Sequence, residues 1–226
     1  MRLKAVIFDV DGTLVDSQAD ILAAMTAAFE AEGLRAPSRA AVLGIVGLSL
    51  DVAIPMLAPD ADHATCVKMV QGYKDAYADL RLLQGADVSS PLYPGARDAL
   101  LSLKGKDEVL LGIATGKSRR GLDKLIEAHG LEGFFLTQQV ADDHPSKPNP
   151  SMIFQAMREL GVEARDTVMI GDTSFDMEMA RAAGVSFVGV AWGYHDVARL
   201  GGADVVIEDF AQLNGALENI WSKEIV

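Results

Sequence analysis

The sequence predicts an α/β protein built on a doubly wound parallel sheet, with a helical segment inserted after the first strand. Short apolar runs alternate with helix-length segments over most of the 226 residues, whereas residues 17–84 contain helical patterns and no convincing strand. Strands that read as continuous apolar runs are typical of a parallel sheet covered by helices on both faces. A hydrophobic content of 50% is enough to form such a core.

Six apolar runs are expected to form the strands. In the first of them, Val6, Ile7 and Phe8 suit the interior of a strand. Because helix-length segments separate the runs, a parallel arrangement is favoured. The runs are AVIFDV (5–10), VLLGIAT (109–115), FFLT (134–137), TVMIGD (167–172), VSFVGVAW (185–192) and ADVVIED (203–209).

Two helices are predicted between these strands from their ends as well as their periodicity. RGLDKLIEAHG (120–130) and PSMIFQAMRELG (150–161) each finish at a glycine suited to a C-terminal cap. The second segment also has Asn149 as a candidate N-cap and Pro150 at the first helical position.

The inserted segment is expected to be all-helical. SQADILAAMTAAFEAEG (17–33) places its apolar side chains on one helical face, with Ser17 as the cap and Gly33 as the stop. ATCVKMVQGYKDAYADL (64–80) repeats this pattern through Val67, Val70, Tyr73, Tyr77 and Leu80. Prolines 37, 55 and 59 are expected to divide the region into short helices. We therefore expect a Rossmann-like core of residues 1–16 and 85–226 and a helical cap of residues 17–84.

Composition excludes several classes of partner. A net charge of −12 and a pI near 4.7 argue against binding to nucleic acid or to an anionic membrane surface. The single cysteine, Cys66, excludes an internal disulfide, and no Cys/His cluster has zinc-ligand spacing. The first residues do not resemble a signal peptide, so a cytoplasmic location is expected. No feature selects between a monomer and a homodimer.

Two carboxylates follow the first predicted strand at a spacing that places them side by side. Side chains two positions apart on an extended chain point the same way, so Asp9 and Asp11 are expected to project together. Two negative charges about 4 Å apart repel by about 4 kcal/mol at an effective dielectric constant near 20. A fold that pairs them therefore usually supplies a cation or a proton.

Four polar signals fall at or near predicted strand ends, where ligands bind in open α/β sheets. Each alone has a structural explanation, as a helix cap or as a surface charge. Together they describe a site for a cation and a tetrahedral anion. The signals are Asp9 with Asp11, Thr115 with Gly116, Lys147 in HPSKPNP, and Asp172 with Asp176 in GDTSFDM.

The candidate cation is Mg²⁺, because Asp9, Asp11 and Asp172 offer hard oxygen ligands. A calcium-binding loop is the rival interpretation of D-x-D-G. Such a loop needs a preceding helix, a glycine at its sixth position and a glutamate at its twelfth. Counted from Asp9, those positions hold Leu14 and Asp20, and a strand precedes them.

In these motifs the chain resembles the haloacid dehalogenase (HAD) superfamily hydrolases of the phosphatase type with a helical C1 cap, and phosphoglycolate phosphatases in particular. The resemblance covers most of the chain, with the motifs in the family's order. They are Asp9-Val10-Asp11-Gly12-Thr13, Thr115 at the end of LLGIAT, Lys147 of SKPNP, and Gly171-Asp172 with Asp176 of GDTSFD.

The resemblance implies an aspartyl-phosphate mechanism that acts on a small phosphorylated metabolite with Mg²⁺. Asp9 would be the nucleophile and Asp11 the general acid and base, with the Asp11 backbone carbonyl as its metal ligand. The other implied roles are phosphoryl binding by Thr115, the Gly116 amide and Lys147, metal binding by Asp172, and an outer acceptor role for Asp176.

The same residues help to distinguish a phosphatase from three alternative functions. A dehalogenase releases halide, which needs no proton, so Asp11 favours phosphate-ester cleavage instead. A β-phosphoglucomutase-like phosphomutase would share the intermediate. The cap segment GIVGLSLD (44–51) carries no basic residue to hold a second phosphate, although Lys117, Arg119 and Arg120 follow Thr115. A non-catalytic binding module is disfavoured by the intact set of acids, threonine and lysine.

Overall fold

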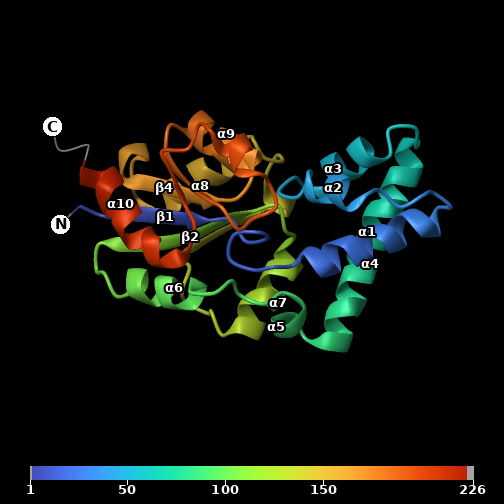
Figure 1. Ribbon diagram of the computed structural model, residues 1–226, viewed down its shortest axis with the longest axis horizontal. Coiled ribbons are helices and arrows are strands. Elements are labelled where there is room, and N and C mark those ends of the chain that lie inside the picture. The colour runs from blue at the N-terminus through green and yellow to red at the C-terminus, as the bar shows by residue number, and fades with distance from the viewer. Residues whose placement is uncertain (1, 223–226) are drawn as a thin grey trace.

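The computed structural model describes residues 2–222, and a six-stranded parallel sheet organises the larger of its two lobes (Figure 1). The strand order is β3-β2-β1-β4-β5-β6. This order reverses direction between β1 and β4, which is where doubly wound sheets bind ligands. The strands are β1 (Lys4–Phe8), β2 (Val109–Thr115), β3 (Thr137–Val140), β4 (Thr167–Gly171), β5 (Ser186–Val190) and β6 (Val205–Ile207).

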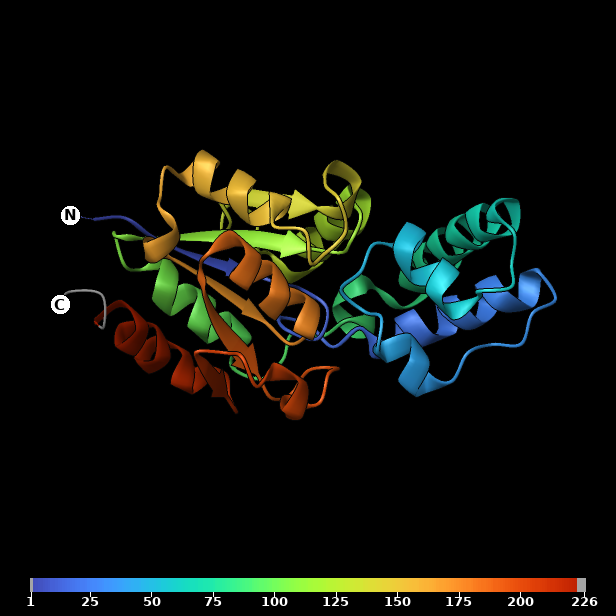
Figure 2. The ribbon, with the colours of Figure 1, turned by 90° about the horizontal axis from the view of Figure 1, so that it is seen from above.

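Helices cover both faces of the sheet, as Figure 2 shows from above. Alternate residues of β1 point to opposite faces, so Val6 and Phe8 belong to one buried cluster and Ile7 to the other. The first cluster includes side chains of α6 (Ala96–Lys104), α7 (Arg119–His129) and α10 (Leu213–Ser222). The second includes side chains of α8 (Ser151–Leu160) and α9 (Ser174–Ala183). The predicted fold class is confirmed.

Four helices form the second lobe, which we call the cap (Figures 1 and 2). They are α1 (Gln18–Ala31), α2 (Arg39–Leu43), α3 (Leu50–Leu57) and α4 (His63–Gln84). A separate buried cluster joins them through residues such as Met25, Ile54 and Met69. A short helix, α5 (Ala86–Ser89), leads back to the sheet. The two connections between the lobes run side by side, with the Asp16 amide donating to the Pro91 carbonyl at 2.9 Å.

The cap is seated on the carboxyl ends of the strands. The Ser49 amide donates to Ser146 Oγ at 2.9 Å, and Arg81 Nη1 donates to the Gly121 carbonyl at 3.0 Å. A Cβ on Gly116 would lie 2.6 Å from the carbonyl oxygen of Gly47, so glycine is needed where these two loops touch. The site at the strand ends is therefore covered by the cap.

Several predicted boundaries need correction. The third strand begins at Thr137 and not at residue 134, because residues 134–136 turn after α7. Pro55 lies inside α3 and does not separate two helices. Helix α8 begins at Ser151 with Pro150 at the N-cap position, although Asn149 Oδ1 still accepts the Ser151 amide at 3.0 Å.

Two details of the predicted cap faces also differ. Ser17 occupies the N-cap position of α1, but its hydroxyl makes no capping bond and donates to Asp11 instead. Val67, which was predicted on the apolar face of its helix, is 54% exposed. In the described part of the chain, no helix is both long and apolar enough to span a membrane.

Candidate active site

Asp9 lies directly beyond the end of β1, at the point where the strand order reverses. Its amide donates to the Ile170 carbonyl at 2.9 Å, which extends the pairing of β1 with β4 and fixes the backbone. One carboxylate oxygen, Oδ1, accepts from Lys147 Nζ at 2.6 Å. The other, Oδ2, is buried and has no hydrogen-bond partner within residues 2–222. A buried, unpaired carboxylate oxygen is costly unless another group engages it.

Lys147 joins Asp9 to Asp176. Its side chain is fully buried, and its ammonium donates to Asp9 Oδ1 and to Asp176 Oδ1, each at 2.6 Å. Asp176 Oδ2 also accepts from Thr173 Oγ1 at 2.6 Å in a capping box that starts α9. The capping box therefore fixes Asp176, and Asp176 in turn fixes the ammonium beside Asp9.

Asp172 follows β4 and is held in place by two loops, at residues 12–13 and 193–194. Its Oδ1 accepts from Thr13 Oγ1 at 2.9 Å and its Oδ2 accepts from the Tyr194 amide at 2.8 Å. A Cβ on Gly12 or Gly193 would lie within 2.3 Å of Asp172 atoms, and Gly12 has a φ of +88°. These glycines leave the space that the Asp172 carboxylate occupies.

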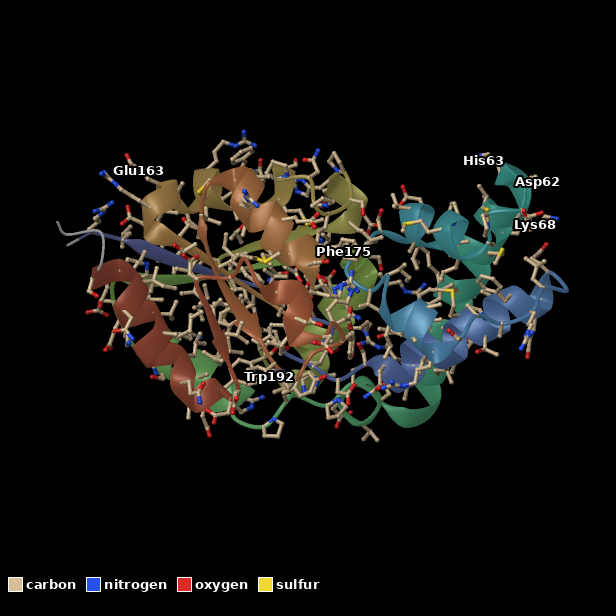
Figure 3. All side chains as sticks on the ribbon, turned by 45° about the horizontal axis from the view of Figure 1, so that its top comes forward. Asp62, His63, Lys68, Glu163, Phe175 and Trp192 are labelled. Carbon is tan, nitrogen blue, oxygen red and sulfur yellow. The ribbon has the colours of Figure 1, made fainter. Side chains whose placement is uncertain are left out.

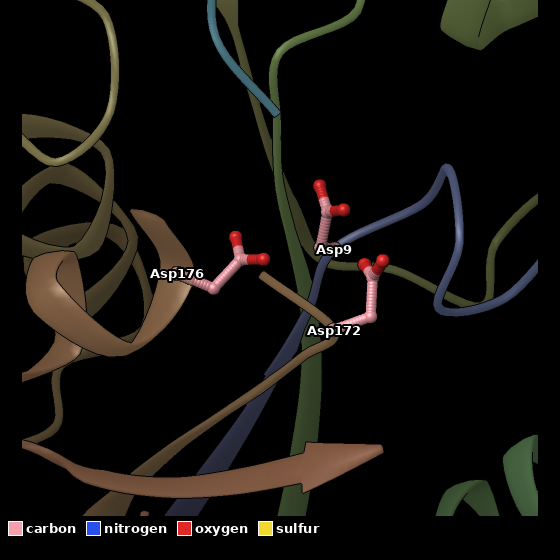
Figure 4. Close-up of side chains that lie close together, drawn as sticks. All are labelled: Asp9, Asp172 and Asp176. Carbon is pink, nitrogen blue, oxygen red and sulfur yellow. The ribbon is translucent and has the colours of Figure 1, made fainter. Parts of the chain in front are cut away.

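The structure brings Asp9, Asp172 and Asp176 together from β1, β4 and α9 (Figure 4). One carboxylate oxygen of each lies within 4.8 Å of the others, and all three residues are buried. Burial raises the pKa of Asp9 to about 7, with Lys147 opposing this shift and Asp176 adding to it. Burial and the charges of Asp176 and Asp9 raise the pKa of Asp172 well above its ordinary value.

Three clustered carboxylates beside one ammonium carry excess negative charge, and their hard oxygens fit a Mg²⁺ ion. The unpaired Oδ2 of Asp9 is the observation that favours a further cation there. The sequence grouped Asp9 and Asp172 with Asp11, whose implied metal ligand is its backbone carbonyl; the third carboxylate of the cluster is that of Asp176, and the set of metal ligands stays a prediction.

Asp11 makes its contacts elsewhere. Lys117 Nζ lies 2.6 and 2.7 Å from its two carboxylate oxygens, and Ser17 Oγ donates to its Oδ1. Burial opposes ionisation of Asp11, but Lys117 and Ser17 hold the pKa of its carboxyl below the ordinary value. For Lys117, burial is again outweighed, because Asp11 and Tyr77 raise the pKa of the ammonium.

Thr115 and Gly116 lie where the sequence expects them, at the end of β2. Thr115 is buried and its Oγ1 accepts from the Lys117 amide at 3.2 Å. Gly116 lies against the cap at Gly47. Their assignment to phosphoryl binding stays a prediction.

A cavity of about 930 Å³ lies between the cap and the strand ends. The core contributes Asp9, Asp11, Thr115 and Lys117 to its wall, and the cap contributes Ser49 and Tyr77, among others. Of the three basic residues after Thr115, Lys117 is buried at the site, Arg120 also lines the cavity, and Arg119 bonds Gln138.

Aromatic residues also contact the loops around the site. The hydroxyl of Tyr77, on α4, accepts from Lys117 Nζ at 3.1 Å. The Tyr194 hydroxyl accepts the Ser17 amide at 2.9 Å. Trp192, labelled in Figure 3, donates from Nε1 to the Thr13 carbonyl at 3.1 Å. Apolar helix spacing predicted Tyr77 as a packing residue, so its contact with the core was not expected.

The chain matches a family model described as haloacid dehalogenase-like hydrolase over residues 6–190. It is 35% identical over 216 residues to the "Probable phosphatase IndB" of Dickeya dadantii, which covers 93% of this chain and 92% of that relative. It is 32% identical over 228 residues to a phosphoglycolate phosphatase of Chromobacterium violaceum, which covers 96% and 98%.

Solved structures share the fold. A hydrolase from Pseudomonas syringae superposes with a TM-score of 0.84 at 26% identity and covers 96% of this chain and 99% of that chain. A β-phosphoglucomutase from Clostridium difficile superposes with a TM-score of 0.84 over 99% of each chain. At 18% identity, that second likeness shows the fold alone.

The parallel sheet and the acidic cluster at its switch point define an α/β protein with a ligand site at the ends of its strands. The chain belongs to the haloacid dehalogenase-like hydrolase family. Within it the protein is a phosphatase, a phosphoric monoester hydrolase, so the resemblance drawn from the sequence motifs is confirmed.

Proposed function

We propose that the protein hydrolyses a small phosphorylated metabolite with Mg²⁺, through a phosphoryl group carried on Asp9. One observation carries this proposal. Asp9 lines the cavity at the switch point of the sheet, with one oxygen bonded to Lys147 and the other unpartnered among residues 2–222. A carboxylate that is positioned through one oxygen and free at the other suits a nucleophile.

The proposed reaction has two steps. Asp9 attacks phosphorus, a bond forms between its carboxylate and phosphorus, and the bond from phosphorus to the leaving oxygen breaks. Asp11 gives that oxygen a proton. Asp11 then takes a proton from water as the water attacks the acyl phosphate, which releases inorganic phosphate and restores the Asp9 carboxylate and the protonated Asp11.

Buried donors support the charge changes in these steps. Lys147 balances negative charge beside Asp9, and its bond to Asp176 keeps it there. Thr115 and the Gly116 amide lie at the end of β2, beside the cavity, where donors to phosphoryl oxygens are needed. The cap lies over the strand ends and forms part of the cavity wall.

The carboxylate cluster supports Mg²⁺ as the cofactor. Asp9 and Asp172 would hold the ion together with the backbone carbonyl of Asp11. Asp176 would act through Lys147, to which its Oδ1 is already bonded. When bound, the ion reduces the repulsion between a carboxylate and a phosphoryl group.

Among substrates, a phosphoglycolate-like compound is favoured because several relatives carry the name phosphoglycolate phosphatase. Sugar phosphates and nucleoside monophosphates are the next compounds to test. A mutase would share the first step, and it differs by returning the phosphoryl group to a sugar hydroxyl.

The test is phosphate release from a panel of phosphorylated metabolites, with Mg²⁺ or with a chelator. Asp9→Asn should abolish release, and Asp60→Asn, a matched change at an exposed cap residue, should leave it intact. Beryllium fluoride should form a phosphoryl-like adduct on the wild-type Asp9 carboxylate. Activity retained by Asp9→Asn would refute the proposal, and isomer exchange without free phosphate would identify a mutase.

A further inference from the structure

Lys117 makes contacts that the proposed mechanism does not yet use. The residue follows β2, and its side chain is 7% exposed. Its ammonium donates to both oxygens of the Asp11 carboxylate, at 2.6 and 2.7 Å. Charge-assisted bonds to both oxygens of one carboxylate fix its orientation as well as its position. Most of what orients the Asp11 side chain therefore comes from a residue 106 positions away.

The same ammonium also contacts the cap. Lys117 Nζ lies 3.1 Å from the hydroxyl of Tyr77 on α4. Tyr77 is itself held, because its ring stacks on Tyr73 with centroids 5.8 Å apart and the Arg81 guanidinium lies 4.7 Å from its ring centroid. A tyrosine supported on two sides is a defined partner for the ammonium.

Asp11 has a second contact that depends on the cap. Ser17 Oγ donates to Asp11 Oδ1, and Ser17 is the residue at which α1, the first cap helix, begins. The Tyr194 hydroxyl of the core accepts the Ser17 amide at 2.9 Å, which holds the serine in place. Both supports of the Asp11 carboxylate thus join the core to the cap.

We propose that Lys117 is a positioning residue, which orients the Asp11 carboxylate for proton transfer and, through Tyr77, ties that orientation to the seated cap. The inference rests on the proposed function, in which Asp11 exchanges protons with the leaving group and with water. It adds a residue from outside the recognised motifs and a reason for its placement beside the cap.

Substrates whose leaving groups differ in basicity can show whether Lys117 positions Asp11 for proton transfer or only supports the structure of the site. An aryl phosphate such as 4-nitrophenyl phosphate releases a weakly basic phenolate, which leaves with little help from an acid. An alkyl phosphate such as 2-phosphoglycolate releases a strongly basic alkoxide that needs a proton in the same step. The ratio of kcat/KM for the two substrates therefore reports how well Asp11 is placed, because kcat/KM covers the steps up to the first bond cleavage.

The experiment compares this ratio in Lys117→Met, Lys117→Arg, Tyr77→Phe and the wild type. We expect Lys117→Met to lower kcat/KM for the alkyl phosphate by about 100-fold more than for the aryl phosphate, which is the scale of general-acid catalysis. Lys117→Arg should recover part of this loss because it restores the charge. Tyr77→Phe should shift the ratio the same way by a smaller factor.

Lys68→Met is the matched control, because this exposed lysine is on the same helix as Tyr77 and is not among the residues that line the cavity (Figure 3). It should leave both rates unchanged. Urea midpoints of each variant show whether it is folded. An equal loss for both substrates in folded Lys117→Met would overturn the inference, as would a smaller loss for the alkyl phosphate.

Asp9→Asn in the same series separates the two proposals. If Asp9→Asn retains activity, the proposed function itself is wrong. If Asp9→Asn is inactive while Lys117→Met keeps the wild-type ratio, the mechanism stands and the role of Lys117 is rejected.

Discussion

Replacing Lys147 by methionine removes the ammonium that bonds both Asp9 and Asp176 while keeping a side chain of similar length. Both bonds are 2.6 Å long and the lysine side chain is fully buried. A hydrogen bond to a charged group contributes about 1.5–3 kcal/mol, and removing one partner of a buried ion pair costs about 3–5 kcal/mol. We expect Lys147→Met to lower the free energy of unfolding by about 3–5 kcal/mol in the absence of metal.

The assay is urea unfolding followed by circular dichroism near neutral pH with a chelator present. Lys106→Met is the control, because its side chain is 30% exposed and its ammonium bonds Asn214. That control should change the free energy of unfolding by less than about 1 kcal/mol. Added Mg²⁺ should restore part of the loss in Lys147→Met, since a cation that binds the folded state stabilises it.

The same electrostatic argument predicts how the loss in the free energy of unfolding changes with pH. Without Lys147, the three clustered carboxylates have no buried ammonium beside them, so protonating them becomes more favourable. The loss should therefore shrink as the pH is lowered toward 4. A loss below about 1 kcal/mol near neutral pH would refute the reasoning, because it would mean that the buried pair contributes no more than a surface pair.

Three further predictions concern the residues around the carboxylates. Burial raises the pKa of Asp9 from 3.8 to about 7, so the contribution of protonated Asp9 to stability is full below about pH 4 and is lost as the pH rises through 7. Metal-free Asp9→Asn should therefore gain stability relative to the wild type as the pH rises through that window, and a difference in urea midpoints that does not change with pH would contradict this. Gly193→Ala would place a Cβ 2.0 Å from Asp172, so the Mg²⁺ concentration for half-maximal activity should rise about tenfold or more; an unchanged value would show that Asp172 is not displaced. Thr173→Ala removes the capping box with Asp176 and should cost about 1–2 kcal/mol in urea unfolding, whereas Thr173→Ser should retain the cap; equal losses would contradict the capping role.

Local patterns were enough to predict the sheet and two of the helices that flank it, α7 and α8. Apolar runs of strand length and glycines at helix ends are short-range signals, and Gly130 and Gly161 adopt the left-handed conformation that ends a helix. The positions of Asp9, Thr115 and Asp172 were predicted for the same reason, because Thr115 ends a strand and each aspartate directly follows one. Since parallel strands end at one edge of the sheet, their meeting there follows from the pattern.

The least reliable predictions concerned residues whose partners are distant in the sequence. Ser17 has the sequence signature of a helix cap, yet its hydroxyl donates to Asp11. Asp9 and Asp11 both line the cavity, but Lys117 was not predicted as the partner of the Asp11 carboxylate. Asp176 was expected in an outer role, but its bonds to Lys147 and Thr173 were not predicted.

The sequence by itself determined that this chain is a parallel α/β enzyme with acids, a threonine and a lysine at or near its strand ends. Each of these features depends on a pattern that spans only a few neighbouring residues. Tertiary structure alone decided which charges neutralise one another: Lys147 bridges Asp9 and Asp176, and Lys117 pairs with Asp11 under the hydroxyl of Tyr77. Such pairs join segments 29 to 138 positions apart. Their geometry depends on how the cap and the helices pack, and no local spacing encodes it.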